Sequence, residues 1–442
     1  MISRQILSVG DLFELENGFA FKSRDFIDQG VPVIKIKNVK AGFFSEHEFS
    51  YVSDKFLTER ANKLAKPQDL LISMSGNRHD GSPETWVGKV AFFDRATPYF
   101  LNQRVGALRL KKEKQASIRF MGYLLSSFPY QEQFIAIATS SGGQANLSPA
   151  QILSAEIDIP NIEEQLEIAA ILGALDDKIE VNRKTAATLE ELAQALYRSW
   201  FVDFDPVHAK AAGRTPAHMD AATAALFPDS FGENGLPEGW EQSTVSAVCE
   251  HVKQTVKPMD QPDQPFHHFS LPAFDTGRVP VLENGKDIKS NKLFVPNNAI
   301  LFSRLNPSIS RVWWAQTDEE AAIPASSTEF YVAKALHELQ TPWLYCLMSS
   351  ANFRDEALFR VTGTSNSHQR VPPKAFAEIE VIKPTDGLLQ AFGEVCGNWF
   401  ERIHAMSEEN QTLAALRDTL LPRLMSGELR VGEAKEQVEA IA

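Results

Sequence analysis

Side chains of the types that read DNA gather in several polar segments of this sequence. Base edges are read by Arg, Lys, Asn and Gln, while phosphates accept hydrogen bonds from Lys, Arg, Ser, Thr and backbone N–H groups. The candidate DNA-binding residues in the first half are Lys35, Lys37, Asn38, Asn77, Arg78, Asn102, Gln103, Arg104, Ser140, Gly142, Gly143, Gln144 and Asn146. Those in the second half are Ser303, Arg304, Asn306, Ser310, Arg311, Thr364, Asn366, His368 and Arg370. The alternative, that both sets are ordinary solvated loops, stays open from the sequence.

Motifs for catalysis are weak by comparison. Asn306-Pro307-Ser308-Ile309 begins like the Asn-Pro-Pro-aromatic motif of amino-methyltransferases, but it lacks the second proline and the aromatic residue that stacks on a flipped base. Asp263, Asp287 and Lys289 loosely fit a nuclease carboxylate–lysine pattern. His267-His268 has no further ligands at metal-binding spacing. We therefore expect no catalytic residue and no metal site, with the nuclease pattern kept as an alternative.

The net charge of −13 is unevenly distributed along the chain. Residues 161–237 contain 6 Lys and Arg against 13 Asp and Glu, and residues 386–442 contain 5 against 10. Residues 1–160 contain 19 against 17, which leaves them slightly basic. The two larger segments can therefore still present basic faces to phosphates, whereas the acidic segments are poor candidates for that contact.

Length and composition predict a multidomain cytoplasmic protein. A chain of 442 residues with 43% hydrophobic content is long enough for two or three domains with real cores. It has no evident secretory signal and no run of about 18 apolar residues, so we expect no membrane association. The three cysteines lie far apart and are expected in the core of a protein from a reducing compartment.

Two long segments carry the elements that must position the polar loops. Apolar residues recur at alternating steps of three and four residues in 165–200 and again in 392–424, which is the pattern of a coiled-coil seam. We expect the two helices to pair with each other, with Asn182 fixing their register and Pro422 kinking or ending the second one. The residues predicted to pair the helices are Leu172, Leu175, Ile179, Asn182, Leu189, Leu196, Trp399, Ile403, Met406, Leu413 and Leu420.

The chain repeats itself at an offset of 223 or 224 residues. FMGYLLSS resembles WLYCLMSS and EIDIP resembles EVIKP, and the two helical seams follow at the same interval, while PQDLLISM resembles PNNAILFS at an offset of 229 residues. Agreement between separate landmarks indicates a duplicated unit. We predict an α+β fold in which two mixed α/β domains are separated by two long antiparallel coiled-coil helices, as a pseudo-twofold internal repeat. The predicted segments are 1–160, first domain; 161–202, first helix; 203–237, linker; 238–385, second domain; 386–427, second helix; and 428–442, a loose tail.

Local patterns in the first domain predict its elements. Alternation predicts a strand over 31–39, and apolar runs predict strands over 69–74, 87–93 and 152–160. Helical spacing covers 118–138, and the Ser/Gly-rich stretch 139–146 is expected to be a flexible polar loop.

The repeat and the two helix ends resemble a known family, the specificity subunits of Type I restriction-modification enzymes. The helix ends LEELAQALYRSWFVDFDP and TLAALRDTLLPRLMSGELRV carry most of the resemblance, and LFELENGFAFKSRDF and LPEGWEQSTV resemble the starts of its target recognition domains. The resemblance implies that each domain binds one half of a split, asymmetric sequence in double-stranded DNA. It also implies that the helices set the spacer and dock two modification subunits.

The same resemblance implies that the chain is not an enzyme by itself. Adenine methylation would belong to the modification subunits, and ATP-driven translocation and cleavage to the restriction subunits. We therefore expect S-adenosylmethionine, ATP and Mg²⁺ in these partners and no cofactor in this chain. Two alternatives from other classes are an autonomous nuclease that uses Asp263, Asp287 and Lys289, and a coiled-coil adaptor that does not bind DNA.

Overall fold

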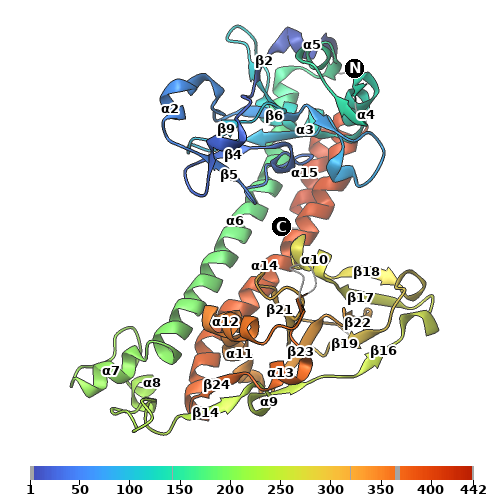
Figure 1. Cartoon of the computed structure of the whole chain (residues 1–442). Coiled ribbons are helices and arrows are strands. Elements are labelled where there is room, and N and C mark those ends of the chain that lie inside the picture. The colour runs from blue at the N-terminus through green and yellow to red at the C-terminus, as the bar shows by residue number, and fades with distance from the viewer. Residues whose placement is uncertain (1–3, 142, 319, 364–368, 441–442) are drawn as a thin grey trace. The chain divides into compact units, whose positions relative to one another are not determined.

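The chain is organised as two compact units that share two long helices. The computed structural model describes residues 4–141, 143–318, 320–363 and 369–440. One unit consists of Met1–Glu180 and Asn410–Ala442, and the other of Val181–Glu409. The helices α6 (Ile162–Phe201) and α14 (Asp386–Ser426) each pass from one unit into the other (Figure 1). Each unit therefore holds one globular part and half of each helix. We call residues 4–160 the first globular part and residues 238–385 the second.

The two globular parts contain the same central sheet. In the first part its strand order is β2-β10-β6-β8, with bounds Phe13–Asn17, Val105–Leu110, Asp69–Ser73 and Val90–Phe93. In the second part the order is β15-β23-β20-β21, with bounds Cys249–His251, Phe330–Ala335, Ala299–Ser303 and Val312–Ala315. All neighbouring strands in both sheets are antiparallel. The repeat in the sequence is thus a repeat of topology.

Both sheets are buried on their two faces, which explains their apolar sequences. Successive residues of a strand point to opposite faces. In β6, Leu70 and Ile72 join the core that includes the long helices, whereas Leu71 joins a separate core on the other face. In β20, Ile300 and Phe302 join the helix-side core, and Leu301 joins the core on the opposite face.

A helix and a pair of terminal strands complete the repeated unit. α3 (Ile118–Ser126) packs on β6 and β8, and α11 (Thr341–Ser349) packs in the same way on β20 and β21. The first and last strands of each part pair with each other: β1 (Gln5–Ser8) with β13 (Glu156–Ile159), and β14 (Glu241–Thr244) with β24 (Glu380–Lys383). These pairs close each globular part just before the long helix that follows it.

The additional sheets differ between the two parts. The first part has β3-β5-β4-β9 (Phe26–Ile27, Ser50–Val52, Val31–Ile34, Phe100–Leu101) and β11-β12-β7 (Thr139–Ser141, Gln144–Asn146, Ser75–Gly76). The second part has the five-stranded β16-β19-β22-β17-β18 (Thr255–Val256, Lys292–Phe294, Ile323–Ser326, Pro265–Phe269, Val281–Asn284). The duplicated scaffold therefore presents two different surfaces.

The long helices run antiparallel where they pair. Within the second unit, the Asn182 amide donates to Glu409 (2.8 Å), while Trp200 and Phe201 at the far end of α6 contact Phe392. Contacts further along α6 are therefore made with earlier residues of α14, so the two helices run in opposite directions. Among the residues predicted to pair the helices, Leu172, Leu175, Ile179, Asn182, Met406, Leu413 and Leu420 are buried, and Leu189, Leu196, Trp399 and Ile403 are half-buried. The predicted α+β fold with two long antiparallel helices is confirmed.

Several local predictions need correction. The strand over 31–39 ends at Ile34, and residues 36–38 form a 3₁₀ turn. The helix over 118–138 is two helices, α3 and α4 (Phe128–Ile137), because Ser127 is extended and Pro129 lies in the first turn of α4. The loop over 139–146 contains the short strands β11 and β12.

The end of the chain also differs from the prediction. α14 continues to Ser426, four residues beyond Pro422, so the proline does not end it. Residues Val431–Glu439 form helix α15, and Ala434 is buried in the core of the first unit, so these residues are not a loose tail. The predicted linker 203–237 contains two short helices, α7 (Asp205–Ala211) and α8 (Ala221–Leu226). Within the described part of the chain, no helix is both long and apolar enough to cross a membrane.

Candidate nucleic-acid interface

Three of the predicted polar segments meet in the first globular part. The strand β12 pairs with β11 on one side and with β7 on the other, which places Asn146 opposite Ser75. The side-chain oxygen Oδ1 of Asn146 accepts hydrogen bonds from Ser75 Oγ (2.7 Å) and from Arg104 Nη1 (2.9 Å). Arg78 Nη2 donates to the backbone oxygen of Ala138 (2.5 Å), just before β11. The structure therefore gathers residues 75–78, 104, 138–141 and 143–146 into one surface, which we call the first polar junction.

Further predicted residues lie within this junction or beside it. The Asn77 amide donates to Thr85 Oγ1 (3.0 Å), which orders the loop that follows β7. Gln103, Ser140 and Gln144 are exposed, and Asn102 is half-buried. Gly143 has φ of +81° with open space around it, so its backbone can approach a ligand closely. Predicted residue Gly142 lies outside the described residues.

The segment Lys35–Asn38 lies apart from the junction and is largely used internally. Lys35 Nζ donates to Ser50 Oγ (2.7 Å), and Lys37 pairs with Glu48 (2.9 Å). Asn38 is fully buried, and its amide donates to the backbone oxygens of Ser45 and His47. The Asn38 side chain therefore holds a turn together and is not exposed to a ligand in this structure.

Lys89 connects this segment to the loop after β7. Its Nζ donates to the backbone oxygens of Glu84 (2.5 Å) and Ile36 (3.5 Å), and only 4% of the residue is exposed. Burial lowers the pKa of Lys89 to about 8. Its ammonium is enclosed between the backbone oxygens of two segments, so it serves the packing of the loops more than the attraction of phosphates.

The second globular part forms an equivalent junction. Leu305 and Thr362 each form a β-bridge with Arg370, and the Asn306 N–H donates to the Gln369 oxygen (2.8 Å). Arg304 Nη2 donates to the Thr328 oxygen (2.6 Å) and Arg304 Nη1 to the Val371 oxygen (3.3 Å). Residues 303–306, 326–329 and 369–371 thus meet, together with Thr362, as the second polar junction.

Arg370 is held at this junction in a defined orientation. It forms a bidentate ion pair with Glu329, at 2.9 Å from Nε and 2.8 Å from Nη2. The hydrogen bond from Arg370 holds the pKa of Glu329 below its usual range, so the pair stays ionised. An arginine has five N–H donors, and Nη1 remains directed away from the Glu329 contacts. Arg370 can therefore be oriented by Glu329 and still donate to a phosphate or a base edge.

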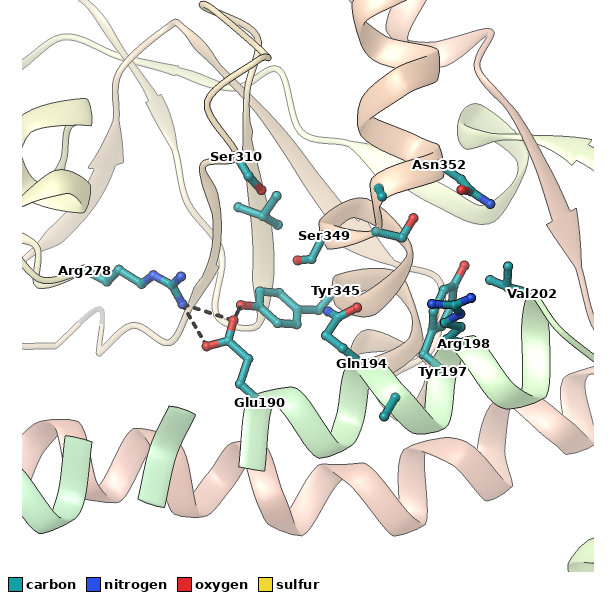
Figure 2. A pocket seen from close by; sticks show the side chains of 14 residues that line it. Glu190, Gln194, Tyr197, Arg198, Val202, Arg278, Ser310, Tyr345, Ser349 and Asn352 are labelled. Carbon is teal, nitrogen blue, oxygen red and sulfur yellow. Dashed lines mark hydrogen bonds and ion pairs between the residues drawn. The ribbon is translucent and has the colours of Figure 1, made fainter. Parts of the chain in front are cut away.

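Some predicted residues of the second set point elsewhere or cannot be placed. Ser303 is 1% exposed, and its hydroxyl donates to the Leu305 oxygen (3.0 Å), so the hydroxyl is enclosed in this structure. Arg311 forms a bidentate pair with Asp275 (2.7 and 2.8 Å). Ser310 lines a cavity of about 710 Å³ together with Glu190 and Asn352 (Figure 2). Predicted residues Thr364, Asn366 and His368 lie outside the described residues.

The residues of the alternative nuclease pattern lie near Lys286, and their described contacts are with Lys286 rather than with one another. Asp263 pairs with Lys286 (3.7 Å), and Lys289 Nζ donates to the Lys286 oxygen (2.5 Å), while Asp287 is exposed. His268 bonds to Glu283 (2.6 Å). Among the described residues there is no group of three His, Cys, Asp or Glu side chains that could hold a metal ion. This geometry gives a hydrolytic reaction no visible support.

Sequence reasoning missed the residues that orient the junctions. Ser75 and Glu329 hold Asn146 and Arg370, yet neither belongs to a base-reading residue type that a pattern search singles out. The oxygens of Ala138 and Thr328 are backbone groups, which sequence cannot mark as partners. The one available signal was position, since both junctions occupy equivalent places in the repeat.

Comparison with known proteins gives one consistent result. Residues 4–191 match the family model described as the Type I restriction modification DNA specificity domain. The chain is 28% identical over 451 aligned residues to the Type I restriction enzyme HindI specificity subunit of Haemophilus influenzae, covering 87% of this chain and 91% of that protein. It is 26% identical over 317 residues to the MjaIX specificity subunit of Methanocaldococcus jannaschii, covering 66% of this chain and 65% of that protein.

A solved structure has a similar fold. The crystal structure of a Type-I restriction-modification system S subunit from M. genitalium matches with a TM-score of 0.54 and 16% sequence identity, over 96% of each chain. At this identity the likeness concerns the fold alone. The sequence matches agree with the resemblance of this chain to Type I specificity subunits.

Proposed function

We propose that this chain, whose residues 4–191 match the model of the Type I restriction modification DNA specificity domain, is the DNA-reading subunit of a Type I restriction-modification complex. In this proposal each globular part recognises one half of a bipartite, asymmetric site in duplex DNA. The observation that carries it is the pair of polar junctions at equivalent places of a duplicated scaffold. Two globular parts with the same central sheet and different polar residues suit two half-sites of different sequence.

The electrostatics agree with contact by the loops rather than by the helices. The acidic residues are concentrated in segments 161–237 and 386–442, which contain the long helices. The junctions instead present Arg78, Arg104, Arg304 and Arg370, each anchored by a hydrogen bond to a neighbouring group. Anchored arginines lose less side-chain freedom when they bind a phosphate or a guanine edge.

Partners supply the chemistry in this proposal. Two modification subunits would bind S-adenosylmethionine and methylate adenine, and restriction subunits would use ATP and Mg²⁺ for translocation and cleavage. This chain would contribute sequence recognition and the distance between the half-sites. Each long helix of about 40 residues measures about 60 Å at about 1.5 Å per residue, which is comparable with two turns of DNA.

The purified complex with its modification subunits should bind duplex DNA in a salt-dependent manner that requires Arg370. We expect Arg370→Ala to weaken binding to the target by about tenfold, because the substitution removes a guanidinium that Glu329 orients for donation to a phosphate or a base edge. Fluorescence anisotropy with a labelled duplex measures this. The matched control is Arg360→Ala, since Arg360 pairs with Glu356 on α12 (Ala351–Phe359) and is expected to change affinity little.

Two results would contradict the proposal and favour the alternatives. Mg²⁺-dependent cleavage by the chain alone that is lost in Asp287→Ala would favour the autonomous nuclease. Absence of binding to any duplex at low salt, with the modification subunits present, would favour a coiled-coil adaptor without a DNA role.

A further inference from the structure

Two clusters outside the polar junctions fasten each globular part to the long helices. The first cluster, which we call the first anchor, consists of Arg119, Tyr123, Asp176, Asp177 and Arg417, all in the first unit. The second anchor consists of Glu190, Arg278 and Tyr345, all in the second unit. In each anchor a carboxylate of α6 accepts a hydrogen bond from the hydroxyl of a tyrosine. This tyrosine belongs to the helix that covers the central sheet.

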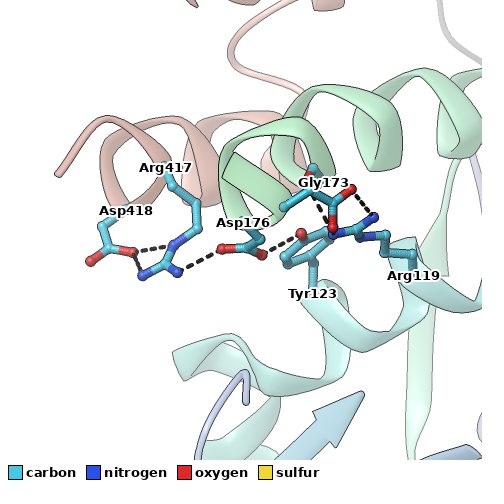
Figure 3. Close-up of polar contacts among 7 residues, drawn as sticks. Arg119, Tyr123, Gly173, Asp176, Arg417 and Asp418 are labelled. Carbon is cyan, nitrogen blue, oxygen red and sulfur yellow. Dashed lines mark hydrogen bonds and ion pairs between the residues drawn. The ribbon is translucent and has the colours of Figure 1, made fainter. Parts of the chain in front are cut away.

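The first anchor joins three helices through one carboxylate. Tyr123 on α3 donates to Asp176 Oδ2 (2.5 Å), and Arg417 on α14 donates to Asp176 Oδ1 (2.8 Å) (Figure 3). Each carboxylate oxygen is therefore engaged by a different helix. Rotation of α3 against α6 would break these directional hydrogen bonds. They therefore resist the rotation more strongly than apolar packing alone would.

Arg119 adds a second set of bonds between α3 and α6. Its guanidinium pairs with both oxygens of Asp177 (2.9 and 2.6 Å) and donates to the Gly173 oxygen (3.0 Å). A Cβ atom at position 173 would lie only 2.8 Å from the guanidinium carbon. Glycine at this position thus lets the arginine lie flat against the helix.

The second anchor has the same chemistry with different elements. Tyr345 on α11 donates to Glu190, and Arg278, which follows α10 (Leu271–Asp275), donates to both Glu190 oxygens (3.2 and 3.1 Å) (Figure 2). Tyr345 is 4% exposed, and Arg278 also lies over the Phe274 ring, 5.0 Å from its centre. Glu190 thus joins α6 to two separate elements of the second globular part.

The two tyrosines are not equivalent in the repeat. When FMGYLLSS is aligned with WLYCLMSS, Tyr345 corresponds to Gly122, and Tyr123 corresponds to Cys346. Both carboxylates also come from α6, although duplication alone would place the second on α14. The two halves therefore reach the same arrangement with non-equivalent residues, which points to a shared requirement rather than to common ancestry of the contact.

Burial keeps both tyrosine hydroxyls protonated. Burial, and then the neighbouring carboxylate, raise the pKa of Tyr123 and of Tyr345 above the ordinary value. Burial would lower the pKa of Arg278, but Tyr345 and Glu190 raise it overall. The two hydroxyl donors thus stay protonated throughout the neutral range, and a carboxylate at such a contact is costly to leave without a partner.

We propose that the two anchors fix the orientation of each globular part on its helix segments and thereby restrict the complex to one spacer length between the half-sites. This inference rests on the proposed function. One base pair changes the position of a half-site by about 3.4 Å and about 34–36°, since a turn of about 10–10.5 base pairs measures about 34–36 Å. A reader that could rotate on its helix would accept a spacer one base pair longer or shorter. Tyr123 and Tyr345 are positioning residues in this scheme.

The test measures methylation of three duplexes by the complete methyltransferase complex. They carry the half-sites identified from methylated adenines in cells, separated by the native spacer or by one base pair more or less. We expect Tyr123→Phe with Tyr345→Phe to lower the preference in kcat/KM for the native spacer about tenfold, while the rate on the native duplex changes little. The control is Tyr130→Phe, which removes a hydroxyl that contacts the Asp158 backbone N–H instead of a long helix.

The outcomes separate this inference from the proposed function. A variant that keeps the full wild-type preference overturns the inference alone. A rate that falls by the same factor on all three duplexes also overturns it, because general damage to folding leaves the preference unchanged. A wild-type complex that methylates none of the duplexes overturns the proposed function and the inference together.

Discussion

Replacing residues 1–158 with the corresponding domain of a related specificity subunit should change one half-site completely and leave the other unchanged. The first globular part closes on itself through the pairing of β1 with β13, so it can be exchanged as a unit. Its helix-side core also contains residues of α6 and α14, and its first anchor contacts Asp176 and Asp177. The donor domain must therefore keep Arg119 and Tyr123, or equivalents, to fit the same helices.

Sequencing of methylated adenines in cells that carry the exchanged chain measures this prediction. A matched control is the reciprocal exchange of residues 238–385, which should alter the opposite half-site. A change of both half-sites after either exchange would show that the two globular parts do not read DNA separately.

The second large effect concerns stability at the far end of α6. Phe392 is fully buried, and its ring lies 5.2 Å from the Phe201 ring and 5.8 Å from the Trp200 ring. Truncation to alanine in such a core costs about 3–5 kcal/mol, because the transferred area is lost and a cavity remains. We expect Phe392→Ala to lower the free energy of unfolding of the second unit by that amount.

Urea unfolding followed by circular dichroism measures this loss. The control is Phe359→Ala, because Phe359 is 87% exposed and its truncation should change stability by no more than about 0.5 kcal/mol. Equal effects of the two substitutions would mean that the aromatic contacts around Phe392 contribute little to the unit.

The long helices and the repeat were the most predictable features of the fold. Their signals are summed over many residues: a seam that continues past Asn182, and landmarks that recur in the same order at offsets of 223 to 229 residues. The local errors arise where one or two residues decide. Ser127 with Pro129 divides α3 from α4, and the strand that begins at Val31 ends at Ile34 because the next residues form a 3₁₀ turn.

The polar junctions were predictable as segments but not as contacts. Residue type identified Arg104, Asn146 and Arg370, and the fold brings the first two together. Residue type cannot show that Asn38 is buried or that the Ser303 hydroxyl is enclosed, because burial depends on segments distant in the sequence. The anchor contacts were not predicted from the sequence for the same reason: Tyr123 lies within an apolar helix, and its partner Asp176 is 53 residues away.

The most direct test of the central claim is the methylome of cells that contain this chain and its modification subunits. We predict methylated adenines in a single motif made of two different half-sites separated by a fixed gap. We also predict that this methylation disappears when this chain is deleted. A continuous motif, a gap of variable length, or methylation that persists without the chain would contradict the claim that its two globular parts read two half-sites of DNA.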